Sequence, residues 1–147
     1  MTKHTNDDVA AIRAAIARQF DSISWSAERS PDWETFADDF LPDATLFPAA
    51  RPIAPKSVEA FIDRMKGIAA GELESLEETV LNTRIQVFGN VAVAMAVCGM
   101  SENGSEPKRG VEAILLVKDQ GHWHIAAQAW DMETAEKMVP ADLLEGD

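Results

Sequence analysis

The chain has a single cysteine, no tyrosine and few basic residues, and each shortage excludes a class of protein. The lone Cys98 cannot form a disulfide within the chain, and it excludes a cysteine-rich zinc site. Because Cys98 lies inside the apolar stretch VAVAMAVCGM, we interpret it as a small buried hydrophobic residue. No apolar stretch approaches the roughly 18 residues that a membrane-spanning helix needs, so we expect no membrane partner.

Positive charge is scarce along the whole sequence. The 147 residues include 13 lysines and arginines against 25 aspartates and glutamates, which gives a net charge of −12. Nucleic acids bind through concentrated positive charge, and here Lys108 and Arg109 form the one adjacent basic pair. We therefore expect no nucleic-acid partner. The polar, acidic N-terminal stretch does not resemble a signal peptide, so we expect a cytoplasmic protein.

The length suits one domain with one core, spanning residues 1–147 with loose ends at 1–7 and 140–147. Apolar residues recur at spacings of three and four in three segments, which predicts three helices. The first helix carries Val9 to Ile23 on its apolar face, the second is short, and the third includes Phe61 to Ile68. Helix N-termini favour side chains that accept backbone hydrogen bonds, so we expect the caps to be Asn6, Ser30 and Ser57.

From about residue 78 the pattern of apolar and polar residues becomes that of β-strands. Alternating apolar and polar residues bounded by turn residues predict strands at 78–88, 91–100, 109–118 and 122–130, after a short strand near 41–47. In the first long strand we expect Leu81, Ile85 and Val87 to share one face. Long strands joined by hairpins pair antiparallel, so the helices must gather on one side of the sheet. The fold class is therefore α+β.

Two of the predicted strands, 91–100 and 111–117, are apolar on both faces. One face can pack on the helices, but the other needs a further cover. We expect a homodimer through the sheet, with the small side chains facing the second copy, namely Ala92, Ala94, Ala96 and Cys98.

Three stretches have the pattern of a known superfamily: PDWETFADDFLPDATLF, VFGNVAVA and the G-x-W-x-I opening of the last strand. Over residues 8–139 the chain resembles the nuclear transport factor 2-like superfamily, also called cystatin-like and including the SnoaL-like proteins. The resemblance implies helices packed on a curved antiparallel sheet that forms a cone with an internal cavity. Members include isomerases, dehydratases, cyclases and binding modules, so the fold does not by itself assign an activity.

The residues that some of these enzymes use are missing from this chain. Ketosteroid isomerases place a general-base aspartate where this sequence has Pro48, and they use a tyrosine that this chain lacks. Their second, protonated aspartate corresponds to a position near Ala113, with Glu112 expected to point the other way. Scytalone-dehydratase-like chemistry needs tyrosines and pocket histidines. The resemblance therefore argues against steroid isomerisation.

One correspondence to polyketide cyclases of the SnoaL type remains. Their last strand is followed by an acid/base aspartate that begins a short terminal helix, eight residues after an isoleucine. Here Trp123 takes the place of that isoleucine and Asp131 follows eight residues later, with 132–138 as the expected helix. The resemblance thus makes Asp131 a candidate catalytic residue. The alternative is that Asp131 caps this helix, a role that aspartate favours.

The last strand also supplies candidate ligand contacts. Gln128 and Trp130 share one face, while Ala127, Ala129 and Asp131 share the other, and a β-bulge would exchange the two faces. The sequence leaves open which face lines the cavity. We expect contact with a small apolar or aromatic molecule from Trp130, Gln128, Trp25, Phe47 and Met95.

Cofactor motifs are not found in the sequence. No cluster of histidines and carboxylates has metal-ligand spacing, and no glycine-rich phosphate loop is present, so we expect no metal and no nucleotide cofactor. Two functions remain open. The protein is either a cofactor-free lyase, isomerase or cyclase that uses Asp131 as its acid/base, or a non-catalytic binder of an apolar small ligand.

Overall fold

A computed structural model describes residues 3–145 of the chain. Four helices and six strands follow one another as α1 Lys3–Ile23, α2 Trp33–Asp38, β1 Phe40–Phe47, β2 Lys56–Ser57, α3 Val58–Ala69, β3 Leu76–Phe88, β4 Val91–Glu102, β5 Lys108–Asp119, β6 His122–Met132 and α4 Ala141–Leu144. The order matches the predicted one, with the two-residue β2 and the short α4 added.

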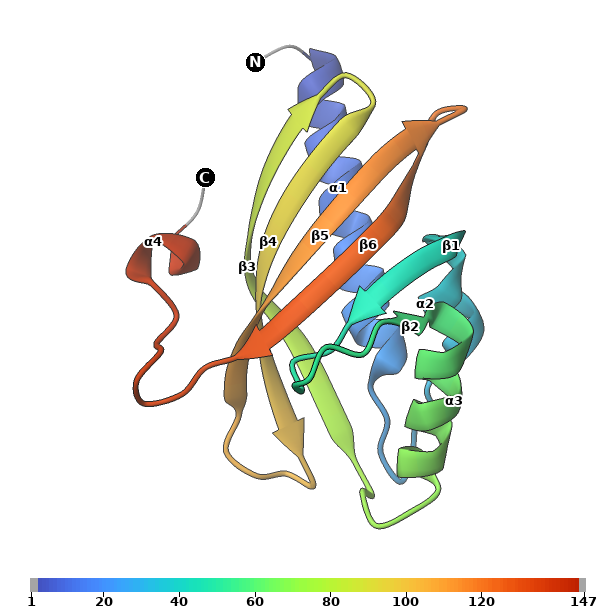
Figure 1. Cartoon of the computed structure of the whole chain (residues 1–147), viewed down its shortest axis with the longest axis vertical. Helices are drawn as coiled ribbons and strands as arrows, with labels where there is room; N and C mark the ends of the chain where they lie inside the picture. The colour runs from blue at the N-terminus through green and yellow to red at the C-terminus, as the bar shows by residue number, and fades with distance from the viewer. Residues whose placement is uncertain (1–2, 146–147) are drawn as a thin grey trace.

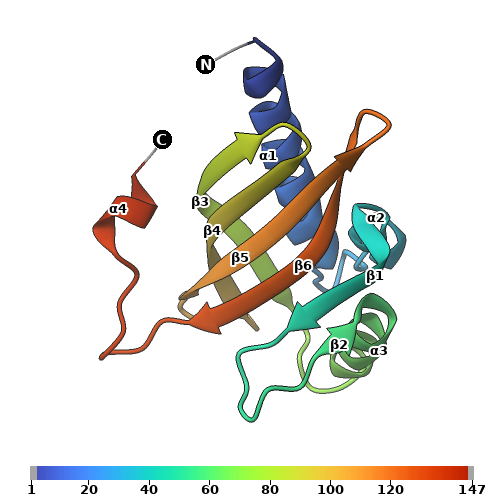
Figure 2. The same cartoon turned by 45° about the horizontal axis from the view of Figure 1, so that its top comes forward.

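The six strands form one sheet in the order β2-β1-β6-β5-β4-β3. Strand β1 runs parallel to β6, and every other pair is antiparallel. The long strands curve around α1, while α3 lies beside β1 and β2 (Figures 1 and 2). The sheet does not close. The α+β class is therefore confirmed, with the helices α1, α2 and α3 on the concave side of a curved sheet.

The N-terminal caps show how local hydrogen bonds determine the residue at which each helix begins. Ser57 caps α3 as expected, because its side chain accepts a hydrogen bond from the backbone of Ala60. The cap of α2 is Asp32 rather than Ser30, since the Asp32 carboxylate accepts from both the backbone and the hydroxyl of Thr35. Helix α1 begins at Lys3, so Asn6 lies inside it and is not its cap.

Two irregularities in the antiparallel pairing bend the sheet and reverse the alternation of side chains. The first lies between Val80 and Asn82 of β3, and the second lies opposite Leu115 and Leu116, where β6 has one extra residue. Leu81 is therefore 51% exposed, whereas Ile85 is 9% exposed on the opposite face. The expectation that Leu81 shares a face with Ile85 is wrong because of the first irregularity.

The two faces of β4 are assigned by burial. Its small side chains are buried in the core with α1, namely Ala92, Ala94, Ala96 and Cys98. The outer face carries Val91, Val93 and Met95, which are 38–49% exposed. The expectation that the small side chains face outward is wrong, because the core beside α1 takes them.

The chain after β6 forms no helix at 132–138. A tight turn there is closed by a bridge between Thr134 and Lys137, and the chain then continues to α4. The side chain of Asn82 donates to the carbonyl oxygens of Leu143 and Glu145, both at 2.6 Å. This segment lies against the outer face of β3 and β4, which places Val97 at 0% exposure.

Candidate functional site

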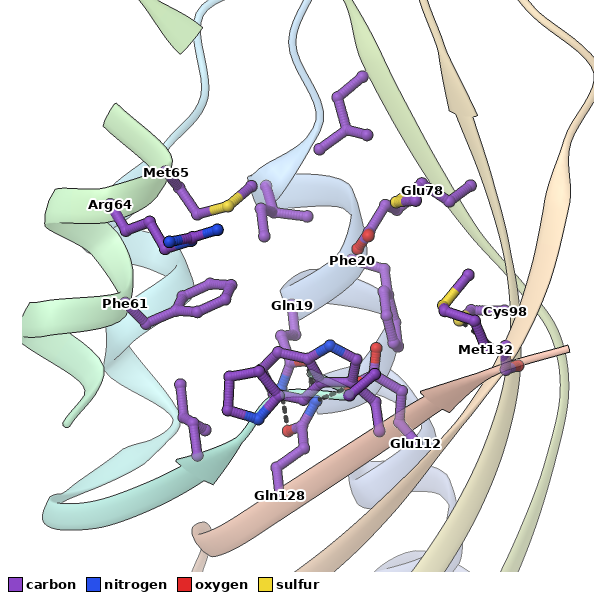
Figure 3. Close-up of a pocket in the computed structure, with 18 of the residues that line it drawn as sticks. Gln19, Phe20, Phe61, Arg64, Met65, Glu78, Cys98, Glu112, Gln128 and Met132 are labelled. Carbon is purple, nitrogen blue, oxygen red and sulfur yellow. Dashed lines mark hydrogen bonds between the residues drawn. The ribbon is translucent and has the colours of Figure 1, made fainter. Parts of the chain in front are cut away.

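A cavity of about 440 Å³ lies between the concave face of the sheet and the helices α1 and α3. Its walls are mostly apolar and include Phe20, Phe36, Phe61, Met65, Trp130 and Met132 (Figure 3). The rings form a continuous surface, since Phe36 stacks on Phe61 at 5.5 Å and Phe61 meets Trp130 edge-on at 5.6 Å. A pocket of this volume and lining suits a small apolar or aromatic molecule.

A chain of three polar side chains crosses the apolar wall. Gln19 of α1 and Gln128 of β6 exchange hydrogen bonds through their amides, at 2.9 and 2.7 Å. Nε2 of Gln128 also donates to Oε1 of Glu112 on β5, at 2.5 Å. All three residues are buried, and Glu112 is 8% exposed. The carboxyl group of Glu112 is thus held in place from α1 through two amides.

Burial dominates the ionisation of Glu112. Removing a carboxylate from water disfavours its charged form, and this raises the pKa of Glu112 to about 7. The hydrogen bond from Gln128 acts in the opposite direction because it stabilises the carboxylate. Near neutral pH the group is therefore present in both protonation states.

A second carboxyl group faces the same cavity from β3. Glu78 is half-buried and its carboxyl points toward the cavity interior (Figure 3). Burial, and then the charge of Glu112, raise the pKa of Glu78 to about 8. Glu78 is therefore mostly a neutral acid at pH 7, while Glu112 is shared between acid and carboxylate.

Cys98 lies on β4 between the two carboxyl-bearing strands and also lines the cavity. Burial, followed by the two glutamates, raises the pKa of its thiol to about 12. The thiol therefore stays protonated, as expected for a small buried hydrophobic residue and not for a nucleophile.

The structure settles which face of the last strand lines the cavity. Gln128 and Trp130 point inward, so two of the predicted ligand contacts lie together at the site. Trp25 is buried elsewhere and donates from Nε1 to the carbonyl oxygen of Leu73. Phe47 is half-buried outside the cavity lining, and Met95 lies on the outer face of the sheet.

Asp131 lies at the rim of the cavity, and its side chain is 55% exposed. Its carboxylate pairs with Lys137 at 2.7 Å and accepts a hydrogen bond from the backbone of Met132. These contacts, with Lys137 first, lower the pKa of Asp131 below its ordinary value. A lowered pKa suits Asp131 less well to removing a proton near pH 7 than a raised one would. No helix follows directly for Asp131 to cap, so the capping interpretation is wrong.

Neither of the two carboxyl groups in the cavity was predicted from the sequence. Glu112 was expected to point away from the cavity, and this is wrong, because Glu112 is buried and Ala113 is exposed. No signal in the sequence marks Glu112 as an interior residue, because its pairing depends on the extra residue of β6. Glu112 pairs directly with Trp130, and directly opposed residues of neighbouring strands lie on the same face. Once Trp130 is placed inward, Glu112 must follow.

Comparison with solved structures identifies the fold. A structure from Novosphingobium aromaticivorans, provisionally named a scytalone dehydratase, matches with a TM-score of 0.71 at 16% identity, covering 91% of this chain and 89% of that protein. A dehydratase from Streptomyces avermitilis, also provisionally named and assigned to the NTF2-like family, matches with a TM-score of 0.71 at 12% identity. The match covers 89% of this chain and 99% of that protein.

A protein of unknown function with a cystatin-like fold, from Nostoc punctiforme, matches with a TM-score of 0.69 at 17% identity. The match covers 87% of this chain and 92% of that protein. No protein-family model matches the chain, and no curated protein sequence matches it. The chain has the nuclear transport factor 2-like, or cystatin-like, fold, which confirms the fold that the resemblance implies. At these identities the comparisons establish the fold and not the activity.

Two further findings concern the described part of the chain. Within residues 3–145, no helix is long and apolar enough to cross a membrane. Over the same range, no group of three histidine, cysteine, aspartate or glutamate side chains comes together as metal ligands would.

Proposed function

We propose that the protein is a cofactor-free lyase that removes water from a small, largely apolar β-hydroxy carbonyl compound bound in the cavity. One observation carries this proposal. Two carboxyl groups, Glu112 and Glu78, face the same apolar cavity and have pKa values near 7 and near 8. A pair of titratable groups with separated pKa values can supply a base and an acid at the same pH.

Glu112 is the base of the proposed reaction. A general base works best when its pKa lies near the operating pH, and the amide of Gln128 fixes the direction of its carboxylate. The carboxylate removes the proton from the carbon next to the substrate carbonyl. The electron pair of that C–H bond forms the new carbon–carbon double bond, and the carbon–oxygen bond to the β-hydroxyl group breaks.

Glu78 is the acid of the same reaction. As a neutral carboxylic acid it passes its proton to the departing hydroxyl group, which leaves as water. After the reaction Glu112 holds one extra proton and Glu78 has lost one. Transfer of one proton from Glu112 to Glu78 through solvent restores the starting state. No electron donor or acceptor is needed.

The comparisons add limited support to this proposal. Two of the similar solved structures are provisionally named dehydratases, and dehydration is a lyase reaction. The tyrosines and histidines expected for scytalone dehydration are not the groups proposed here. Water loss in this protein would instead depend on the two glutamates.

The second candidate is a non-catalytic binder of an apolar small molecule. The network of Gln19, Gln128 and Glu112 favours it, because hydrogen bonds within the protein already satisfy these buried groups. A role of Asp131 as acid/base also stays a prediction. Its ion pair with Lys137 and its lowered pKa suit it less well to proton abstraction than Glu112.

A panel of aromatic β-hydroxy ketones tests the proposal, because loss of water gives conjugated enones that absorb in the near ultraviolet. We expect Glu112→Gln and Glu78→Gln each to lower kcat/KM by at least about 100-fold, the usual contribution of a general acid or base. Asp131→Asn is the matched control and should keep wild-type activity. The profile of kcat/KM against pH should be bell-shaped, with limbs near pH 7 and 8.

Three outcomes decide between the candidates. If the ketones raise the melting temperature without forming enone, the binder replaces the lyase. If Asp131→Asn removes turnover while Glu112→Gln keeps it, the acid/base is Asp131. Loss of turnover in both glutamate variants, with the control active, supports the lyase.

A further inference from the structure

The charged groups of the cavity are separated by sign. The acids lie on the four strands β3 to β6, whereas the two bases, Lys56 and Arg64, belong to β2 and α3; the four acids are Glu78, Glu102, Glu112 and Asp131. The side chain of Arg64 points into the cavity between Phe61 and Met65 (Figure 3). A ligand in the cavity would therefore meet a positive wall and an acidic wall at the same time.

Arg64 has no assigned task in the fold. Arg64 is exposed to solvent at the edge of the cavity, and within residues 5–145 its side chain makes no hydrogen bond or ion pair. The other arginines are engaged at the surface, as Arg18 is with Asp39 and Arg29 is with Asp21. A guanidinium group that extends over an apolar cavity has its donors available for a ligand.

We propose that Arg64 binds the carboxylate of a small monocarboxylic acid, whose apolar body lies on Phe61 and Trp130 and whose other end reaches Glu112. A planar guanidinium group suits a carboxylate because it donates two parallel hydrogen bonds. This inference rests on the proposed function, because it takes the same cavity as the substrate site and names the class of substrate.

The charges of the chain limit the ligand to one negative group. The net charge of −12 and the ionised fraction of Glu112 oppose a second anionic group. The same carboxylate orients the ligand, since the ligand's own carboxylate is repelled from Glu112 and attracted to Arg64. The uncharged end of the molecule is thereby directed at Glu112, where the proposed reaction takes place.

Naphthoate and naphthamide form a matched pair of probes, because they share size and shape and differ in charge. We expect calorimetry at pH 7 and low salt to show naphthoate binding at least about tenfold more tightly than naphthamide. Arg64→Gln should abolish this preference and leave the affinity for naphthamide unchanged, and Arg64→Lys should keep part of it. Arg84→Gln is the control, because Arg84 pairs with Asp142 on the outer face.

The outcomes separate this inference from the proposed function. Equal affinities for the two probes, or a preference that survives in Arg64→Gln, would overturn the role of Arg64 and leave the lyase proposal standing. If neither probe binds at about 1 mM, both proposals about the cavity fail. Glu112→Gln should keep the preference for naphthoate even where turnover is lost, so failure of catalysis alone does not affect this inference.

Discussion

The amides of Gln19 and Gln128 donate to each other's oxygen atoms, so helix α1 and strand β6 are joined by two reciprocal hydrogen bonds. Each amide group has two N–H donors, and the second donor of Gln128 is directed at Glu112. The orientation of one buried carboxyl group therefore depends on a residue of α1 that does not touch it.

Gln19→Leu should test this dependence. Loss of the partner leaves the oxygen of Gln128 unsatisfied and frees its amide to turn away from Glu112, so we expect a free-energy loss of about 1–3 kcal/mol. The pKa of Glu112 should rise, because the hydrogen bond that lowers it is weakened. Chemical denaturation and carboxyl NMR titration measure the two effects. Gln86→Leu, at an exposed position of β3, should change neither.

The pH dependence of stability should reveal the two buried carboxyls. Their folded-state pKa values, about 7 and about 8, lie above the ordinary value of 4.5, so the folded protein binds more protons than the unfolded chain between these values. The free energy of unfolding should therefore fall as pH rises from about 4.5 to about 8. Three carboxylates have lowered pKa values and affect stability in a separate, more acidic pH range, namely Asp32, Asp131 and Glu133. The stability that they contribute is lost as pH falls through their folded-state pKa values.

Glu78→Gln should reduce the decrease in the free energy of unfolding with rising pH. Each pKa unit corresponds to about 1.4 kcal/mol, and solvent screening of the half-buried Glu78 reduces the full effect, so removing the ionisable group should raise the free energy of unfolding at pH 9 by about 1–3 kcal/mol relative to wild type. Urea denaturation at several pH values measures this. Glu77→Gln is the control at the neighbouring exposed position, and an equal gain there would argue against burial as the cause.

Asp131 and Lys137 should behave as a surface ion pair. Because both side chains are 55% exposed, we expect Asp131→Asn and Lys137→Gln to lower the melting temperature only slightly and by similar amounts. Raising the salt concentration should remove the difference from wild type. A large loss in Asp131→Asn alone would show that Asp131 has a role beyond this pair.

The outer face of the sheet remains our candidate for a dimer contact. Val93 lies opposite Leu115 in the β4–β5 pairing, Met95 follows on the same face, and all three are 38–49% exposed. We expect wild type to sediment as a dimer at tens of micromolar, and Val93→Asp to weaken the dimer by at least about tenfold, since it buries an unpaired charge. Ile53→Asp, in the exposed loop before β2, should leave the dimer intact. A monomeric wild type would contradict the proposal.

The sequence predicts much of the fold because periodicity and turn residues are local signals. The hairpin turn between β5 and β6 places Asp119 opposite His122, as a tight turn at Gln120 and Gly121 requires. Continuing that register without interruption would place Glu112 opposite Ala129. The extra residue of β6 shifts the partner to Trp130, and local sequence contains no signal that positions such a bulge.

The candidate site was harder to predict for a second reason. Glutamate is rarely buried in a core, so an interior Glu112 contradicts the usual preference. Gln128 and Trp130 were expected to share one face of the last strand, and both line the cavity; their contact with a ligand stays a prediction. Met95 was misplaced because β4 is apolar on both faces, and only the packing of α1 decides which face is covered.

The irregularity at Leu81 has a consequence for how such a cavity can change in evolution. Before Leu81, the even-numbered residue Glu78 faces the interior. After Leu81, the odd-numbered residues Thr83 and Ile85 face the interior. Deleting the single residue Leu81 would restore uninterrupted pairing and leave Glu78 opposite Met100 and Thr83 opposite Ala96, so both side chains would keep their faces. A one-codon deletion can thereby straighten the wall of the cavity while its interior acid stays in place.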